Sequence, residues 1–281
     1  MTSSQQEILN LTMATANTRN IKQISHVRDI VLNGRISPEV QSRLVKDILK
    51  FLLYHRDQIP LPYDQLKYYF EKQENIKKGS EASKLSQLLD AVQDFCDNLD
   101  VIFSQSVSVE SLWILIGPTV ATPKEVFQIH FSNHSSSEPL STIPSTKLCS
   151  RLLHKSLVTY NALIDTNPPP ITSLHILFQG QRSSNIQWFK PKHSFKVPKR
   201  GQSFTFHILS YKELSMVEEA SNMAKEKDPQ LHQREDFNRI GNNTSDYNRE
   251  DDLIWYAAPK AIKGVRDTVL CIPKQGETWV Q

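Results

Sequence analysis

Residues 112–131 read LWILIGPTVATPKEVFQIHF, and this stretch decides the fold. Its first five residues are all apolar and are followed by a Gly-Pro pair, which is typical of a central strand buried on both faces. Near its end, Phe127, Ile129 and Phe131 alternate with polar residues, a pattern that predicts a half-buried strand. The middle of the chain is therefore expected to form the core of a sheet.

Two long amphipathic helices are predicted before this stretch. Ser37 and Pro38 begin the first helix, because Ser is a favoured N-cap and Pro is tolerated in the first turn. Its apolar residues recur every four positions, and the helix is expected to end before Pro60. The second helix covers about 81–103, where apolar residues step by three or four. Between them, a proline-rich corner leads into a short helix that starts at Tyr63.

After residue 131, one more helix is predicted over 147–164, and then only strands. Apolar patterns predict strands at 174–178, 204–208 and 253–256, with a last short strand at 268–272. This order lacks the strand–helix alternation of a parallel sheet. It predicts an α+β fold in which an antiparallel sheet carries helices on one face.

Polar segments define the expected domain organisation. Residues 1–36 are rich in Ser, Thr, Asn and Gln and are predicted to form a disordered N-terminal tail, in which 24–32 is a candidate short helix. Residues 37–281 are predicted to form one domain. A flexible insertion is expected at about 213–250, where the chain is heavily charged and has few large apolar residues.

Composition limits the classes of function. The net charge of +3 on 281 residues is too small for a nucleic-acid footprint over the whole surface. The three cysteines are far apart and form no CxxC, so they indicate neither a disulfide framework nor a zinc site. No apolar run has the length of a signal peptide core or a membrane span. We therefore expect a protein of the cytosol or nucleus that does not associate with membranes.

No catalytic motif supports an enzyme. The sequence contains no Walker A loop, GxGxxG, GxSxG or HExxH, and it has only eight glycines. His130 and His134 are four residues apart, but one is expected at a strand end and the other in a loop, so a solvated pair is favoured over a metal site. The prediction is a binding protein without catalytic residues, metal or cofactor.

A basic arm lies at residues 188–201, WFKPKHSFKVPKRG. Its two prolines predict an extended, irregular segment, and no Asp or Glu occurs between Asp165 and Glu213. Three interpretations remain open: a solvated loop anchored by Trp188 and Phe189, a nucleic-acid contact, or a docking element for an acidic protein surface.

The predicted third helix exposes residues at positions three and four apart, namely Arg151, His154, Lys155 and Val158. One interpretation is an ordinary solvated face. The other is a partner-binding face, because Leu153 and Val158 add apolar area beside the charges. Composition alone leaves both interpretations open.

Three islands of sequence resemble a known family. They are residues 54–72, YHRDQIPLPYDQLKYYFEK; residues 188–201, quoted above; and residues 251–267, DDLIWYAAPKAIKGVRD. In this order and at this spacing they resemble the comet family of adaptors, which bind the spindle-checkpoint protein Mad-two. The resemblance spans roughly residues 38–267.

The resemblance implies a HORMA-like fold, with an antiparallel sheet backed by three helices on one face and a C-terminal safety-belt segment. It also implies a non-enzymatic adaptor that binds the closed form of Mad-two by pairing HORMA domains. Such adaptors present Mad-two to a hexameric AAA+ ATPase of the pachytene-checkpoint family, which promotes checkpoint silencing and mitotic exit. The expected location is the nucleus and cytoplasm, with the spindle or kinetochore in mitosis.

Carried over residue by residue, the resemblance implies two contact sites and two anchors. The Mad-two-binding face would comprise His55, Arg151, Leu153, His154, Lys155 and Val158. The ATPase docking arm would comprise Lys190, Pro191, Lys192, Lys196, Lys199 and Arg200, with Trp188 and Phe189 as anchors. Two alternatives stay open: a nucleic-acid-binding module that uses arm residues 188–201, and a HORMA protein that captures a closure peptide. For the C-terminal segment 269–281, two possibilities are also open: it fills the chain's own safety belt, or it forms a free tail.

Overall fold

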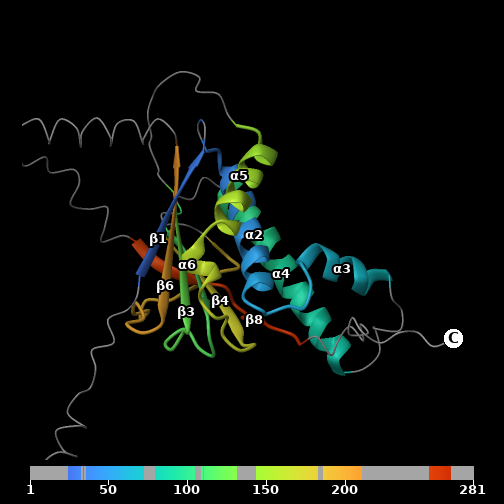
Figure 1. Cartoon of the computed structure of the whole chain (residues 1–281). Coiled ribbons are helices and arrows are strands. Elements are labelled where there is room, and N and C mark those ends of the chain that lie inside the picture. The colour runs from blue at the N-terminus through green and yellow to red at the C-terminus, as the bar shows by residue number, and fades with distance from the viewer. Residues whose placement is uncertain are drawn as a thin grey trace, which may run out of the picture.

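The computed structural model describes residues 25–32, 34, 36–72, 80–104, 109, 111–131, 144–182, 186–210 and 253–266. In this part of the chain a central sheet carries its helices mainly on one face, and Figure 1 shows α2, α4 and α5 together there. The predicted α+β class is confirmed. The elements, in chain order, are β1 (Ser25–Leu32), α2 (Pro38–His55), α3 (Tyr63–Lys72), α4 (Ser80–Ser104), β2 (Ser111–Ile116), β3 (Glu125–Phe131), α5 (Thr146–Val158), α6 (Asn161–Ile164), β4 (Ser173–Gln181), β5 (Lys190–Pro191), β6 (Gln202–Ser210), β7 (Leu253–Ala257) and β8 (Ile262–Lys263).

The sheet has the strand order β1-β6-β3-β2-β4-β7-β5, and β8 pairs with β4. β2 is antiparallel to β3 and β4, and β7 is antiparallel to β4 and β5. β6, however, is parallel to both β1 and β3, so the prediction of an antiparallel sheet is wrong at this edge. The reason is connectivity: β6 follows the arm from the opposite edge of the sheet instead of a hairpin turn, and parallel neighbours require such a long connection.

Alternating side chains give the sheet two apolar faces. On the helix face, Leu112 and Ile114 of β2 and Phe127 of β3 pack with α2, α4 and α5 in the main core. On the far face, Trp113 and Leu115 belong to a smaller cluster with residues of β3, β4 and β7. All six residues of β2 are buried, which confirms the predicted central strand.

Residues 25–32 form a strand, so the candidate helix in the N-terminal tail is wrong. All eight residues of β1 pair in register with β6, from Ser25 opposite Ser203 to Leu32 opposite Ser210. The predicted domain therefore gains a segment that was assigned to the tail. Its partner strand β6 lies far along the chain, so the local composition of residues 25–32 could not predict this pairing.

The predicted helix at 147–164 is two helices. α5 ends at Val158 and α6 begins at Asn161, because Tyr160 turns inward against the rings of Phe204 and Phe206. The predicted insertion at 213–250 and the predicted strand at 268–272 lie outside the described residues, as do residues 1–24.

Arg56 closes α2 and is the largest fully buried side chain, with 1% of its surface exposed. Its Nε donates to Glu125 Oε2 at 3.0 Å, and its Nη2 donates to Glu125 Oε1. The remaining N–H groups donate to the backbone oxygens of Leu163 at 3.2 Å, Thr166 at 2.9 Å and Asn167 at 3.0 Å. All five donors of the guanidinium are used. Burial raises the pKa of the Glu125 carboxyl, and the hydrogen bonds from Arg56 oppose this rise.

Gln58 extends this buried polar cluster to the C-terminal segment. Its amide nitrogen donates to Arg56 O at 2.7 Å, and its amide oxygen accepts from Thr172 N at 2.8 Å. Its backbone oxygen accepts from Val265 N at 2.9 Å, and a Cβ on Gly264 would lie 2.9 Å from the same oxygen. The sequence islands 54–72 and 251–267 therefore meet at this corner.

Replacing Arg56 with Met is expected to lower the free energy of unfolding by about 3–5 kcal/mol, because Glu125 would stay buried without its partner. Urea denaturation followed by tryptophan fluorescence measures this change. The matched control is Arg43→Met, which removes a half-exposed i,i+4 pair with Asp47 and should cost less than about 1 kcal/mol. Equal losses in the two variants would contradict the assigned role of Arg56.

Candidate functional site

α5 lies against α2, and their side chains join two regions that the sequence predicted separately. Ser150 donates to Asp47 at 2.6 Å. One turn further along both helices, the ring of Phe51 stacks on His55 at 4.8 Å and meets His154 edge-on at 6.4 Å. His55 and His154 therefore share one aromatic neighbour on a common surface.

The exposed part of this surface is here named the α2–α5 face. Arg151, His154 and Lys155 are exposed, and 58% of Val158 is exposed. Sequence reasoning missed three further members. They are Phe51, which is half-buried, Tyr54, which is 46% exposed, and Leu148, which is 43% exposed. The face comprises Phe51, Tyr54, His55, Leu148, Arg151, His154, Lys155 and Val158.

Leu153 does not belong to the face, and its predicted place there is wrong. The side chain is fully buried, with 0% exposed. It lies one turn from Cys149 and one turn from Leu157, which are both buried on the same side of α5. This four-residue spacing is visible in the sequence and points Leu153 into the core.

The α2–α5 face combines apolar and aromatic area with two basic residues, Arg151 and Lys155. His55 is half-buried, and its Nδ1 is buried without a hydrogen-bond partner in the described part of the chain. Burial lowers the pKa of His55, and the positive charge of Arg56 lowers it further. A mixed apolar and basic surface of this kind suits a protein partner rather than a small substrate.

The arm begins on the helix face of the sheet. Phe189 is buried and packs edge-on against Phe95 of α4 at 6.3 Å and Phe178 of β4 at 4.9 Å. Trp188 is half-buried beside it, with the two ring centroids 4.7 Å apart. The arm is therefore joined to the core at its first two residues.

The arm then bends around the sheet edge to the far face. Lys190 and Pro191 pair with β7, and Lys192 N donates to Trp255 O at 2.7 Å. Phe195 N donates to Lys192 O at 3.1 Å, and the Phe195 ring packs against Trp255 at 4.9 Å. The arm is thus held on both faces of the sheet, and its tip is a short turn with a defined backbone.

All six residues of the predicted docking arm are exposed in the structure. They are Lys190, Pro191, Lys192, Lys196, Lys199 and Arg200. The arm passes the β5 edge of the sheet, whereas α5 contacts β1 at the opposite edge. The start of the arm and the α2–α5 face therefore lie at opposite edges of the sheet, whereas the end of the arm, at Lys199 and Arg200, leads into β6 beside β1.

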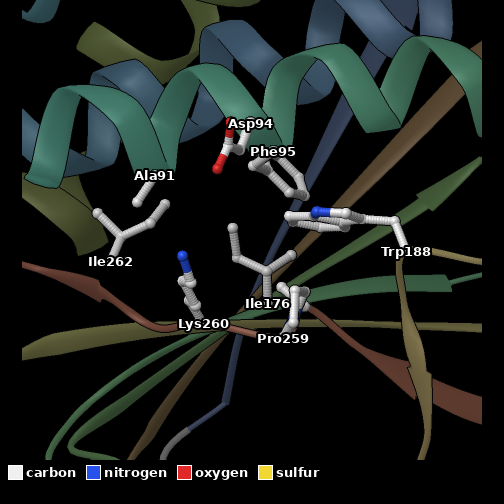
Figure 2. Close-up of a pocket in the computed structure, with 9 residues that line it drawn as sticks. Ala91, Asp94, Phe95, Ile176, Trp188, Pro259, Lys260 and Ile262 are labelled. Atoms are coloured by element: carbon white, nitrogen blue, oxygen red, sulfur yellow. The ribbon is translucent and has the colours of Figure 1, made fainter.

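A small cavity lies beside the arm, between α4 and the segment that follows β7. Figure 2 shows Trp188 on one side, Asp94 and Phe95 above, and Lys260 below. Its volume is about 50 Å³, enough for one small side chain. Its nine lining residues include no Ser, Cys or His, so it offers no side-chain nucleophile of those types.

In the described residues, no three His, Cys, Asp or Glu side chains are placed to bind a metal ion. The helices of that same part of the chain are too short or too polar to cross a membrane.

Comparison with known proteins identifies the family. Residues 1–223 match the family described as "p31comet: Mad1 and Cdc20-bound-Mad2 binding". The human MAD2L1-binding protein is 30% identical over 220 residues, which cover 72% of this chain and 78% of the relative. The mouse MAD2L1-binding protein is 26% identical over 250 residues, which cover 85% of this chain and 78% of that relative. The chain belongs to the p31comet family, which confirms the resemblance drawn from the three islands.

Replacing His55 with Gln is expected to reduce the loss of folding free energy that occurs as the pH is lowered below neutrality. Because the pKa of His55 is lowered in the folded state, the unfolded chain takes up the proton first, near its ordinary value of about 6.5. The contribution of His55 to the free energy of unfolding is complete above about pH 6.5, and it is lost as the pH falls toward the pKa of the folded state. Urea unfolding at pH 7.5, 6.5 and 5.5 should show the wild type losing more stability than His55→Gln. Parallel profiles would contradict this assignment.

Proposed function

We propose that this chain is a non-enzymatic adaptor that binds the closed form of Mad2 and presents it to a hexameric AAA+ ATPase of the pachytene-checkpoint family. The observation that supports the proposal is a pair of surfaces at opposite edges of the sheet, the α2–α5 face and the start of the arm at Lys190–Lys192, on a chain of the p31comet family. An adaptor needs such separation, because both partners must be bound at the same time.

The α2–α5 face is the proposed Mad2 contact. The relatives are named for binding MAD2L1, and the family description includes Cdc20-bound Mad2. Exposed Tyr54, Leu148 and Val158 supply apolar area, and Arg151 and Lys155 flank it with charge. Central apolar or aromatic residues with a polar rim are the usual composition of a specific protein interface. Pairing between two HORMA-like domains would bury this area.

The arm is the proposed ATPase contact. Its five Lys/Arg residues would steer the encounter with an acidic surface, and its prolines reduce the entropy lost on docking. Phe189 and Phe195 hold the arm on both faces of the sheet, so Pro191 and Lys192 lie on a segment with a defined backbone. The ATPase would then partly unfold Mad2 and release it from the checkpoint complex. This would silence the spindle checkpoint and promote mitotic exit, in the nucleus and cytoplasm and at the spindle or kinetochore.

Capture of a closure peptide is less well supported. The position that such a peptide would take, between β4 and the arm strand β5, is filled by β7 of the same chain. An external peptide would have to displace five residues of paired strand.

Nucleic-acid binding is also less well supported. Single-strand binders present aromatic rings on which bases stack. Here Phe189 is buried, and Phe195 is packed against Trp113 and Trp255. Binding of nucleic acid would also weaken steeply and log-linearly with salt, whereas an interface with an apolar centre should weaken only mildly.

Replacing Val158 with Asp is expected to weaken binding to closed Mad2 by at least tenfold, because an unpaired charge would be buried in the interface at a cost of about 2–5 kcal/mol. Isothermal calorimetry with purified closed Mad2 measures the change. Thermal unfolding should remain near the wild type, since Val158 is 58% exposed in the free protein.

Val101→Asp on α4 is the matched control for this substitution, because Val101 is 49% exposed and lies outside the face. It should bind Mad2 as the wild type does. Leu153→Ala, in contrast, should lower the free energy of unfolding by about 2–5 kcal/mol through loss of core packing. Equal affinities for Val158→Asp and the wild type would show that the end of α5 does not lie in the interface with Mad2.

The double substitution Pro191→Ala with Lys192→Ala is expected to abolish stimulation of the ATPase and to leave Mad2 affinity unchanged. Both side chains are exposed, and the hydrogen bond from Lys192 N to Trp255 O does not need either of them. ATP hydrolysis with and without the adaptor measures the first effect. Lys263→Ala, an exposed lysine on β8, is the control. Retained stimulation in the double variant would show that the motor docks elsewhere.

A further inference from the structure

The N-terminal strand β1 contacts the end of α5 through Arg28. The Arg28 Nε donates to Ser156 Oγ at 3.0 Å, and its Nη2 reaches Thr159 Oγ1 at 3.5 Å. The same guanidinium lies over the Tyr160 ring, 5.8 Å from the centroid. One side chain of β1 therefore contacts the last turn of α5, its C-cap residue and the residue at which the chain turns inward.

The sequence of α5 itself stabilises this end weakly. The C-cap residue of α5 is Thr159 rather than Gly, which is the favoured residue at a helix end. At the other end of the helix, the side chain of the N-cap residue Ser145 makes no capping hydrogen bond. Thr159 Oγ1 donates to Lys155 O at 2.9 Å, so Arg28 bonds to the same hydroxyl that holds the last turn. A cation here also complements the negative end of the helix dipole.

Contacts from other elements hold α5 at successive turns. Asp47 of α2 accepts from Ser150, and Phe51 of α2 meets His154. Arg28 provides the corresponding contact at the turn that carries Lys155 and Val158. Without it, this turn would keep the buried side chains of Leu157 and Tyr160 and the hydrogen bond from Thr159 to Lys155, next to the break between α5 and α6.

We propose that Arg28 is a positioning residue for partner binding, and that β1 belongs to the recognition unit. The proposal rests on the proposed contact between the α2–α5 face and Mad2. Arg28 does not need to touch Mad2. It orders Lys155 and Val158 before the encounter, so that their ordering entropy is not lost on binding.

β1 does not depend on Arg28 for its place in the sheet, which makes the residue testable. Its eight residues pair with β6, and Ile30 and Leu32 are buried in the main core. His26 also stacks on Phe204, with ring centroids 5.3 Å apart. Replacing Arg28 therefore removes the contact to α5 and leaves the strand.

The first measurement is hydrogen exchange of the free protein, which needs no partner. In Arg28→Ala, the backbone amides of residues 155–160 should exchange about tenfold faster, since a charge-assisted hydrogen bond is lost. Amides of β6 should keep their wild-type rates. Asp29→Ala is the matched control, because Asp29 is the next residue on β1 and faces the other side, toward His207.

The second measurement is calorimetric affinity for closed Mad2. Arg28→Ala should raise the Kd by about tenfold, Arg28→Lys should restore part of the affinity, and Asp29→Ala should match the wild type. Unchanged exchange at 155–160, or equal Kd values for Arg28→Ala and the wild type, would overturn the proposal. If the wild type itself fails to bind Mad2, the proposed function falls, and exchange at 155–160 alone then supports or overturns the ordering role of Arg28.

Discussion

The buried pairing of Arg56 with Glu125 is the constraint on which the rest of the structure depends. It joins the end of α2, the start of β3 and the backbone that follows α6 in one fully bonded cluster. Neither charge can be buried alone, because an unpaired ion in the interior costs several kcal/mol. The cluster therefore sets where α2 ends, and with it the position of Tyr54 and His55. Through Gln58 it also fixes the segment after β8, so the α2–α5 face and the segment that contains Val265 meet at one corner.

The two apolar faces of the sheet explain how the α2–α5 face and the arm come to lie on different parts of one domain. The helices cover one face and present the α2–α5 face near β1. The far face leaves Trp113 and Trp255 to be covered by Phe195, which brings the arm around the opposite edge. Between these surfaces the strands are continuously hydrogen-bonded.

Local sequence patterns predicted the helices and strands that bury a regular set of apolar residues. The bounds of α2 and α4 follow from apolar spacing, and β2 follows from its unbroken apolar run. β1 could not be predicted, because an edge strand has half-exposed side chains and depends on β6, far along the chain. The pairing of Arg56 with Glu125 spans 69 residues and leaves no local signal. Leu153 is different, since its spacing from Cys149 and Leu157 already indicated a core position.

The candidate site shows the same division. Its residue types could be predicted from one helix and one arm, but the surface exists only because α2 and β1 hold α5 in place. Asp47, Phe51 and Arg28 make these contacts, and they come from two other elements. Substitutions at such supporting positions change the arrangement of a binding face without altering its composition. The arrangement of this face therefore depends on tertiary packing as much as on the residues it exposes, and this is why it could not be predicted from the sequence of α5 alone.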